Sequence, residues 1–387
     1  PLVPAALPAQ GLALENFTLL DGDGTLTPGI TILVEDGRIA RRGAQPALSE
    51  GVRRVAGEGL HLTPALVDAG TALGLGSPNL CEEVREVTPH ITPLAGLDPW
   101  DGRFREVLAG GVGTVALLPG TANVIAGTSA VLRLTGPGGR PEVAVERGAL
   151  VATLGLDPTR GNTRFAGSYY FRRPNSRMGT NWVFRQAFHR ARREGKGENP
   201  GRELLRLALE GELPLRITAR PEFDITTAIR LAGEFGLRIR AIDEAPEAYR
   251  QAKLLAERKI PVVLAPMSRP MTRDQADYEI DYIARLARAG VPLAIQTGRG
   301  LSRHHLIEEA RLALRFGLTP RDAIRAVTLV PARILGLADR LGTLAPGKEA
   351  DLVIWNGHPL SQTSRPLCVI LAGQVKHGAL PRQEGSL

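Results

Sequence analysis

Short apolar runs alternate with helix-like stretches through the second half of the sequence, and this alternation limits the possible folds more than any other feature. The apolar runs cover residues 214–218, 237–242, 260–265 and 291–296. Stretches of helical character lie around and between them, at 177–193, 202–210, 225–235, 246–257, 278–289 and 304–316. Strands separated by helices of about ten to fourteen residues pair in parallel. This half of the chain is therefore predicted to be α/β with a parallel sheet.

Four earlier runs are also strand candidates, at 64–69, 112–118, 130–134 and 150–154. Eight strands with helices between most of them predict a (β/α)8 TIM-like barrel. Residues 11–60 have a different character, because short strand-like runs there are separated by Asp-Gly turn signals at 21–24 and 35–38. A small β unit is therefore expected ahead of the barrel.

The run Pro64-Ala-Leu-Val-Asp-Ala and the small residues after it resemble the first barrel strand of the metal-dependent amidohydrolase superfamily. Residues 319–357 resemble the end of the same chains. The inner segments 119–127, 175–179 and 224–230 are similar to the imidazolonepropionase-related branch. The resemblance covers the chain from about residue 12 to residue 378. It implies a barrel at 63–339 and a composite β-sandwich whose two parts are residues 1–62 and 340–387.

The family usually places metal-binding histidines after its first, fifth and sixth barrel strands, and a general-base aspartate after its eighth. The matching positions here hold Gly70, Ala72, Thr218, Arg220, Ile242 and, for the aspartate, Gly298 or Thr297. A hydrolytic metal needs three or more converging His, Asp or Glu ligands, and arginine brings positive charge instead. The resemblance therefore implies vacated metal positions. We expect no metal, no other cofactor and no metal-dependent hydrolysis.

Other residues keep an enzymatic alternative open. Asp224, Asp243, Glu244 and His90 are candidate acids or bases, and Asp68 matches a family residue with a structural role. Cys81 and the pair His304-His305, which follows the eighth strand and is expected at the barrel mouth, are candidates for a different metal site. Neighbouring helical residues point about 100° apart, so such a pair seldom shares one ion. The alternative is an active hydrolase of non-peptide C–N bonds, such as those of cyclic amides, with an atypical site.

Residues 158–193 hold nine arginines, seven aromatic side chains and no acidic residue. Basic residues interleaved with aromatics can bind phosphates and stack on bases. The structural explanation is a helix that buries its aromatic face while its arginines stay solvated. A loop from this segment over the barrel mouth would make a basic pocket, whose candidate ligand-binding residues are Asn123, Arg164, Arg177, Arg220 and Arg299. A small anionic molecule is the expected ligand, and nucleic acid is the less favoured partner.

The net charge of +8 comes from five lysines and forty-three arginines against forty acidic residues, a bias that is typical of a GC-rich genome. No apolar run is long enough to span a membrane, and the first residues lack the basic start of a signal peptide. Two cysteines exclude a disulfide framework, so a cytoplasmic location is expected. A homo-oligomer is compatible with the family fold. The favoured hypothesis is an amidohydrolase-like binding or scaffold protein, with the atypical hydrolase and the anion or nucleic-acid binder as alternatives.

Overall fold

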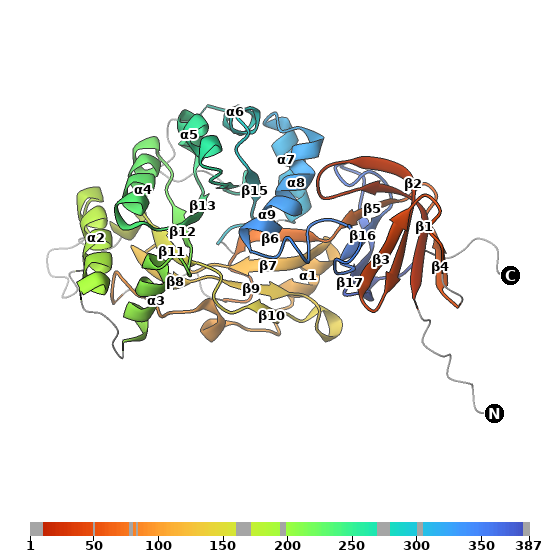
Figure 1. Ribbon diagram of the computed structural model, residues 1–387, viewed down its shortest axis with the longest axis horizontal. Coiled ribbons are helices and arrows are strands. Elements are labelled where there is room, and N and C mark those ends of the chain that lie inside the picture. The colour runs from red at the N-terminus through yellow and green to blue at the C-terminus, as the bar shows by residue number, and fades with distance from the viewer. Residues whose placement is uncertain are drawn as a thin grey trace, which may run out of the picture.

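The computed structural model describes residues 11–48, 51–76, 80–82, 84–159, 172–193, 199–268, 279–299 and 305–381. Figure 1 shows a barrel flanked by helices and, to its right, a layered unit of strands in which the red start and the blue end of the chain lie together. The (β/α)8-type barrel and the composite β-sandwich are both confirmed.

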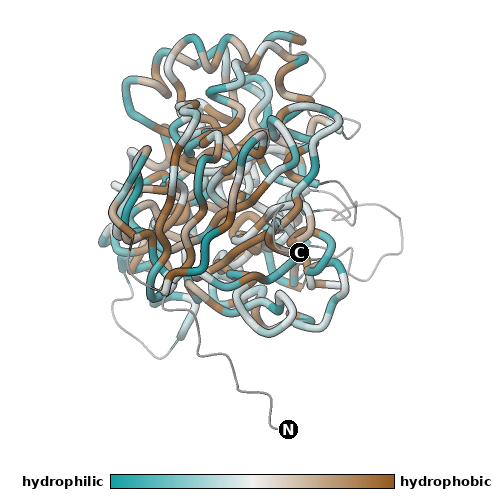
Figure 2. The backbone as a smooth tube through the Cα atoms, turned by 90° about the vertical axis from the view of Figure 1, so that its right-hand side faces the viewer, coloured by the Kyte–Doolittle hydropathy of each residue, from teal (hydrophilic) through white to brown (hydrophobic). Residues whose placement is uncertain are grey.

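Strands from both ends of the chain form one eight-stranded sheet in the β-sandwich. They are β1 (Leu12–Leu20), β2 (Leu26–Glu35), β3 (Arg38–Gly43), β4 (Arg53–Ala56), β5 (His61–Pro64), β16 (Leu352–Trp355), β17 (Pro366–Leu371) and β18 (Gln374–Gly378). The two Asp-Gly turns join β1 to β2 and β2 to β3 as antiparallel hairpins, as predicted. Leu14, Phe17, Leu62 and Ile354 belong to one buried cluster of this unit. Hydrophobic and hydrophilic segments accordingly alternate along its strands in Figure 2.

The buried parallel strand predicted at 64–69 is confirmed for residues 66–69, but its start is wrong, because Pro64 belongs to the preceding strand of the sandwich. β5 ends at Pro64 and pairs antiparallel with β16 of the sandwich. β6 (Leu66–Thr71) then pairs in parallel with β7 (Val112–Leu117) of the barrel. The chain therefore passes from sandwich to barrel at Ala65, within one continuous apolar run whose hydrophobicity carries no mark of the change.

Parallel strand pairs make up most of the barrel wall. β6 pairs with β7 on one side, and the later strands pair with one another around the rest of the wall. After β6 and β7 its strands are β8 (Ile125–Thr128), β9 (Ala130–Arg133), β11 (Leu150–Thr153), β12 (Leu215–Thr218), β13 (Ile239–Asp243), β14 (Val262–Leu264) and β15 (Leu293–Ile295). The strands from β11 to β15 are parallel neighbours in sequence order. A parallel bridge between Thr71 and Gly298 joins the eighth strand back to the first.

The third barrel position departs from the expected parallel pattern. β9 pairs antiparallel with β7, and β8 pairs antiparallel with β11, so this strand runs against both of its neighbours. The connection from Leu118 to Val124 explains the reversal, because a parallel crossover needs a dozen or more residues. A further strand, β10 (Glu142–Val145), extends this edge beyond β9.

Helices cover the outside of the barrel. They are α1 (Arg103–Ala109), α2 (Arg177–Arg193), α3 (Pro200–Leu209), α4 (Glu222–Phe235), α5 (Ala252–Glu257), α6 (Tyr282–Arg288), α7 (Leu306–Arg315), α8 (Pro320–Val327) and α9 (Leu329–Ile334). The stretch predicted as one helix at 246–257 begins as a 3-10 helix, η4 (Pro246–Gln251), before α5. Thr319 caps α8 by accepting from the Asp322 N–H, with Pro320 at the first position, as predicted.

Helix α9 packs under the barrel, where it shares an apolar cluster with small residues of the strands. Val67, Ala116, Ala241 and Ala294 are among these residues, and all are buried. Helix α9 therefore marks the end of the barrel that lies opposite to the strand C-termini. Among the helices of the described ranges, none has both the length and the apolar character that a membrane-crossing segment needs.

Candidate functional site

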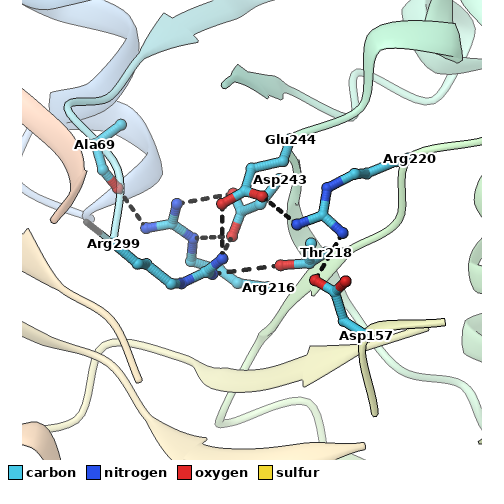
Figure 3. A network of polar contacts seen from close by, with 8 residues as sticks. All are labelled: Ala69, Asp157, Arg216, Thr218, Arg220, Asp243, Glu244 and Arg299. Atoms are coloured by element: carbon cyan, nitrogen blue, oxygen red, sulfur yellow. Dashed lines mark hydrogen bonds and ion pairs between the residues drawn. The ribbon is translucent and has the colours of Figure 1, made fainter. Parts of the chain in front are cut away.

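A network of arginines and carboxylates lies at the C-terminal ends of β12, β13 and β15, where barrel enzymes build their sites (Figure 3). Its innermost pair joins Arg216 on β12 to Asp243 at the end of β13. Arg216 Nε and Nη2 donate to the two carboxylate oxygens at 3.1 and 2.8 Å, and both side chains are almost completely buried. Arg216 Nη1 also donates to the Ala69 carbonyl at 2.6 Å, which ties β12 to the first barrel strand.

A second set of ion pairs continues from this core toward the barrel mouth. Arg220 lies between two carboxylates, with Nη1 2.7 Å from Asp157 Oδ2 and Nη2 2.5 Å from Glu244 Oε2. Arg299 Nη1 donates to Glu244 Oε1 at 2.9 Å, and its Nη2 donates to the Thr218 hydroxyl at 3.3 Å. Figure 3 shows these side chains converging from strands on opposite sides. The network is therefore continuous from Asp157 to the first strand.

The charges in this network balance. Three guanidinium groups face three carboxylates: Arg216, Arg220 and Arg299 against Asp157, Asp243 and Glu244. Burial alone would raise the pKa of the Glu244 carboxyl, but Arg299 and Arg220 outweigh it and hold that pKa below its ordinary value. Glu244 also has a φ of 56°, an uncommon backbone conformation for this residue type. The fold thus holds Glu244 charged between two arginines.

Near the end of the first barrel strand, the space beside Gly70 is occupied by a side chain that follows the eighth strand. Gly70 lies against Gln296, and a Cβ at residue 70 would lie 2.1 Å from Gln296 Oε1 and 2.7 Å from Leu118 Cδ1. Gln296 is completely buried, and neither atom of its amide has a hydrogen-bond partner within the described ranges. The space that a larger residue at position 70 would need is therefore occupied by a glutamine side chain.

Asp68 fixes the join between the first and eighth strands. Its Oδ1 accepts from the backbone N–H groups of Gly70 and Thr297 at 3.0 and 3.1 Å, and its Oδ2 accepts from the Thr297 hydroxyl. Burial raises the pKa of this carboxyl to about 6, although those hydrogen bonds and Arg216 act in the opposite direction. These contacts join the first strand to the residues after the eighth, which agrees with the structural role expected for Asp68.

Known proteins resemble this chain over most of its length. The model of the amidohydrolase family matches residues 208–376. The crystal structure of an amidohydrolase from Thermotoga maritima superposes with a TM-score of 0.87 at 29% identity, covering 95% of this chain and 100% of that one. The chain belongs to the amidohydrolase superfamily. The branch inferred from the sequence also agrees with an imidazolonepropionase of Cereibacter sphaeroides, which is 29% identical over 89% of this chain and 93% of that protein.

A second relative differs in length. The amidohydrolase tasK of Hapsidospora irregularis is 28% identical over an alignment 370 residues long, which covers 82% of this chain. The alignment covers only 36% of that protein. This chain therefore spans about a third of the length of tasK. The activity of the whole tasK protein does not carry over to it.

The superfamily's metal positions were tested against the residues that stand there. Gly70 and Ala72 offer no lone pair, Arg220 is a cation, and Thr218 accepts a hydrogen bond from Arg299. Ile242, the position matched to the sixth-strand ligand, packs in the core cluster shared with the helices, and its neighbour Asp243 lies in the ion-pair network. In the described part of the chain, no three His, Cys, Asp or Glu side chains converge as a metal site. These residues do not fit a superfamily-type metal.

Two of the candidate acid or base residues lie outside the network. His90 is exposed and lies beside Gly201 at the start of α3. Asp224, in the first turn of α4, accepts from Arg177 Nε at 3.2 Å and so joins α4 to α2. Asp243 and Glu244 are the two candidates that the fold brings together.

The candidates for a second metal site are also dispersed. His305 lies against Gly110, which precedes β7 and therefore lies at the far end of the barrel from Gly298. Its expected position at the mouth is wrong, and His304 lies outside the described residues. Cys81 is near Gly120, and burial raises the pKa of its thiol. These groups are too far apart along the barrel to share one ion.

The candidate ligand-binding residues are mostly engaged in the fold. Asn123 is fully buried and donates to the Glu82 carbonyl and the Thr88 hydroxyl at 3.0 and 2.9 Å. Arg220 and Arg299 are compensated by carboxylates, so the free basic pocket expected from them is not what the described residues form. Arg164 lies outside the described residues.

The described part of the basic aromatic segment agrees with the structural explanation. Phe184 and Phe188 on α2 pack with Phe235 of α4 in the core. Arg173 and Arg185 pair with Glu86 and Glu234. Two of the segment's arginines are thus paired with carboxylates, which weakens the hypothesis of a phosphate-binding surface along it.

Sequence reasoning missed Arg216, Asp157 and Gln296 as parts of the centre. Arg216 did carry a signal, because a charged residue inside a buried parallel strand needs a partner. Asp157 lies in a short 3-10 turn after β11 and carried no such mark.

Substitution of Gly70 by alanine is expected to destabilise the fold by about 1–3 kcal/mol, because the new Cβ would overlap Gln296 and Leu118 in a closed core. Chemical unfolding measures the effect. Shortening the neighbour in G70A/Q296A should restore part of the loss. Gly102→Ala is the matched control, since a Cβ at residue 102 meets nothing within 4 Å. Equal losses from G70A and G102A would contradict the close packing at the first strand.

Proposed function

We propose that this chain is an amidohydrolase-superfamily protein that does not hydrolyse its ligand with a metal and that keeps the barrel for binding or as a scaffold. The observation that carries the proposal is the buried Arg216–Asp243 pair and its extension through Arg220, Glu244 and Arg299. A hydrolytic metal needs converging lone pairs and an open position for water. Guanidinium groups supply neither, and their charge opposes a cation.

Unsatisfied polar atoms around the same centre support a retained binding role. Gln296 Nε2 and Oε1, Thr153 Oγ1 and the Nε atoms of Arg220 and Arg299 are buried without a hydrogen-bond partner among the described residues. Buried polar groups are nearly always satisfied, by protein or by a bound molecule. Because the network is already charge-balanced, these atoms favour a small polar molecule with acceptor oxygens. A small molecule with a carboxylate group has such acceptor oxygens, and it agrees with the small anionic ligand expected from the sequence.

The second candidate is a hydrolase of cyclic C–N bonds that uses this atypical residue set. The relatives, an amidohydrolase and an imidazolonepropionase, favour it. Against it, Asp157, Asp243 and Glu244 are each held by an arginine, which lowers their basicity.

The test is metal content and hydrolysis on the same preparation. Protein purified without chelator should hold less than about 0.1 equivalent of any transition metal, unchanged after incubation with zinc or manganese. It should not open a panel of cyclic amides that includes an imidazolone ring. An imidazolonepropionase prepared in parallel is the positive control. Tightly held stoichiometric metal, or turnover that a chelator abolishes, would overturn the proposal and favour the second candidate.

We further propose that the protein works in the cytoplasm. Cys81 and Cys368 form no disulfide, and Cys368 is buried, which raises the pKa of its thiol to about 11. Two cysteines outside any disulfide suit a reducing compartment.

A further inference from the structure

A cavity lies at the opposite end of the barrel from the ion-pair network. It has a volume of about 480 Å³, and the residues that begin β13, β14 and β15 form one wall. Helices α8 and α9 form the other wall. The pocket is within the size range of small-molecule sites. We call it the basal pocket, because it opens where the strands begin and the network lies where they end.

The basal pocket concentrates positive charge. Arg238, Arg240, Lys259, Arg325 and Arg333 line it, and Asp322 is the one carboxylate among its lining residues. Asp322 lies 3.9 Å from Arg325 and also accepts from Thr319, so it serves one of the five cations. For the other four, the described residues place no carboxylate within ion-pairing distance. The arginines of the ion-pair network, by contrast, are each paired.

Two of these cations, Arg238 just before β13 and Arg240 near its start, are close together in the chain. Burial lowers the pKa of the Arg240 guanidinium, and the neighbouring charge of Arg238 lowers it further. The fold therefore holds the half-buried Arg240 beside the exposed Arg238, without the carboxylate partner that the arginines of the ion-pair network have. An anion bound between them would relieve that repulsion, and arginine binds phosphate through two parallel hydrogen bonds.

The rest of the pocket wall is apolar. Ile239, Pro261, Pro292 and Val330 lie among the cations, together with Ile334 of α9. A bare inorganic ion would leave this surface in contact with water. A ligand with an apolar or planar body attached to a multiply charged group would cover the apolar wall and neutralise the arginines at once.

We propose that the basal pocket binds a small organic phosphate of the nucleotide type. Arg238, Arg240 and Arg333 hold the phosphate groups, and the body of the ligand lies against Ile239, Pro292 and Ile334. More than one phosphate charge is required, since four uncompensated cations line the site. The inference concerns a site separate from the ion-pair network, so it stands or fails independently of the proposed loss of metal-dependent hydrolysis.

Calorimetric titration of the full chain with ATP, AMP, pyrophosphate and adenosine tests this inference. ATP should bind most tightly, pyrophosphate more weakly, and neutral adenosine weakest of the set. The affinity for ATP should fall steeply as salt is raised, as for other phosphate contacts. No heat with any phosphate at millimolar concentration would overturn the proposal. Equal affinities for ATP and pyrophosphate would overturn the role given to the apolar wall.

Variants locate the binding. Arg240→Gln and Arg333→Gln should each weaken ATP binding by about tenfold or more, because each removes a charge-assisted contact to phosphate. Arg315→Gln on α7 is the matched control, since this exposed arginine is outside the pocket and the charge change is the same. Circular dichroism melting checks that the variants are folded. ATP binding that is weakened equally by R315Q, or not at all by R240Q and R333Q, would place the phosphate elsewhere.

Discussion

Replacing Arg216 with methionine is expected to lower the free energy of unfolding by about 3–5 kcal/mol. Arg216 and Asp243 are almost completely buried, so the substitution leaves the Asp243 carboxylate in the core without its bidentate partner. Arg299 does not replace it, because its Nη2 is 3.8 Å from Asp243 Oδ2 and its Nη1 already serves Glu244. The bond from Arg216 to the Ala69 carbonyl is lost as well. Urea unfolding of wild type and variant under the same conditions measures the change.

Two further variants separate the pair from its surroundings. R216M/D243L removes both charges, and it should recover much of the loss, because a buried ion pair can be replaced by apolar residues at little net cost. Arg206→Met breaks the ion pairs of Arg206 with Glu203 and Glu210 on the surface of α3 and should leave the unfolding midpoint nearly unchanged. A stable R216M, or an R216M/D243L as unstable as R216M, would show that the pair does not hold the barrel centre together.

The architecture was predictable because it rests on local periodicity. Apolar runs and helical stretches recur along the chain with turn residues between them, and the strands from β12 to β15 begin and end close to the predicted limits. Strand direction is not local. Residues 130–134 read as a strand, yet nothing in their hydrophobicity shows that β9 runs antiparallel to β7. The short connection from Leu118 to Val124 was the available clue.

The sequence indicated which residues lie at the centre of the site, but it did not indicate which residues they contact there. Gly70, Thr218, Arg220 and Arg299, which the family resemblance singled out, lie at or just after the C-terminal ends of barrel strands. Their contacts are long-range: Arg220 bonds to Asp157, 63 residues away, and Arg216 bonds to Ala69, 147 residues away. No local sequence pattern indicates which carboxylate an arginine will pair with. The arginines therefore predicted an uncompensated basic pocket, whereas carboxylates balance their charge in the structure.

Replacing Asp68 with asparagine is expected to remove a pH dependence of stability worth about 3 kcal/mol. Burial raises the pKa of this carboxyl from 3.8 to about 6 in the folded chain. Between these two values the folded protein still holds the proton that the unfolded chain has released, so folding stability falls as the pH rises and levels off above the folded pKa. Asparagine carries no such proton, and its amide can still accept from Gly70 and Thr297 and donate to the Thr297 hydroxyl. The difference in unfolding free energy between D68N and wild type, measured from about pH 4 to about pH 8, should therefore shift in favour of D68N.

The Thr297 hydroxyl gives this prediction its control. Its hydrogen bond to Asp68 Oδ2 favours the ionised carboxylate, so Thr297→Val should move the midpoint of the pH effect upward from about 6. Thr297→Ser keeps the donor and should leave that midpoint where it is. A difference curve between D68N and wild type that is flat over this range would mean that Asp68 is ionised in the fold at acidic pH. The polar contacts that Asp68 accepts, together with Arg216, would then outweigh its burial, and the join between the first and eighth strands would be held by a charge.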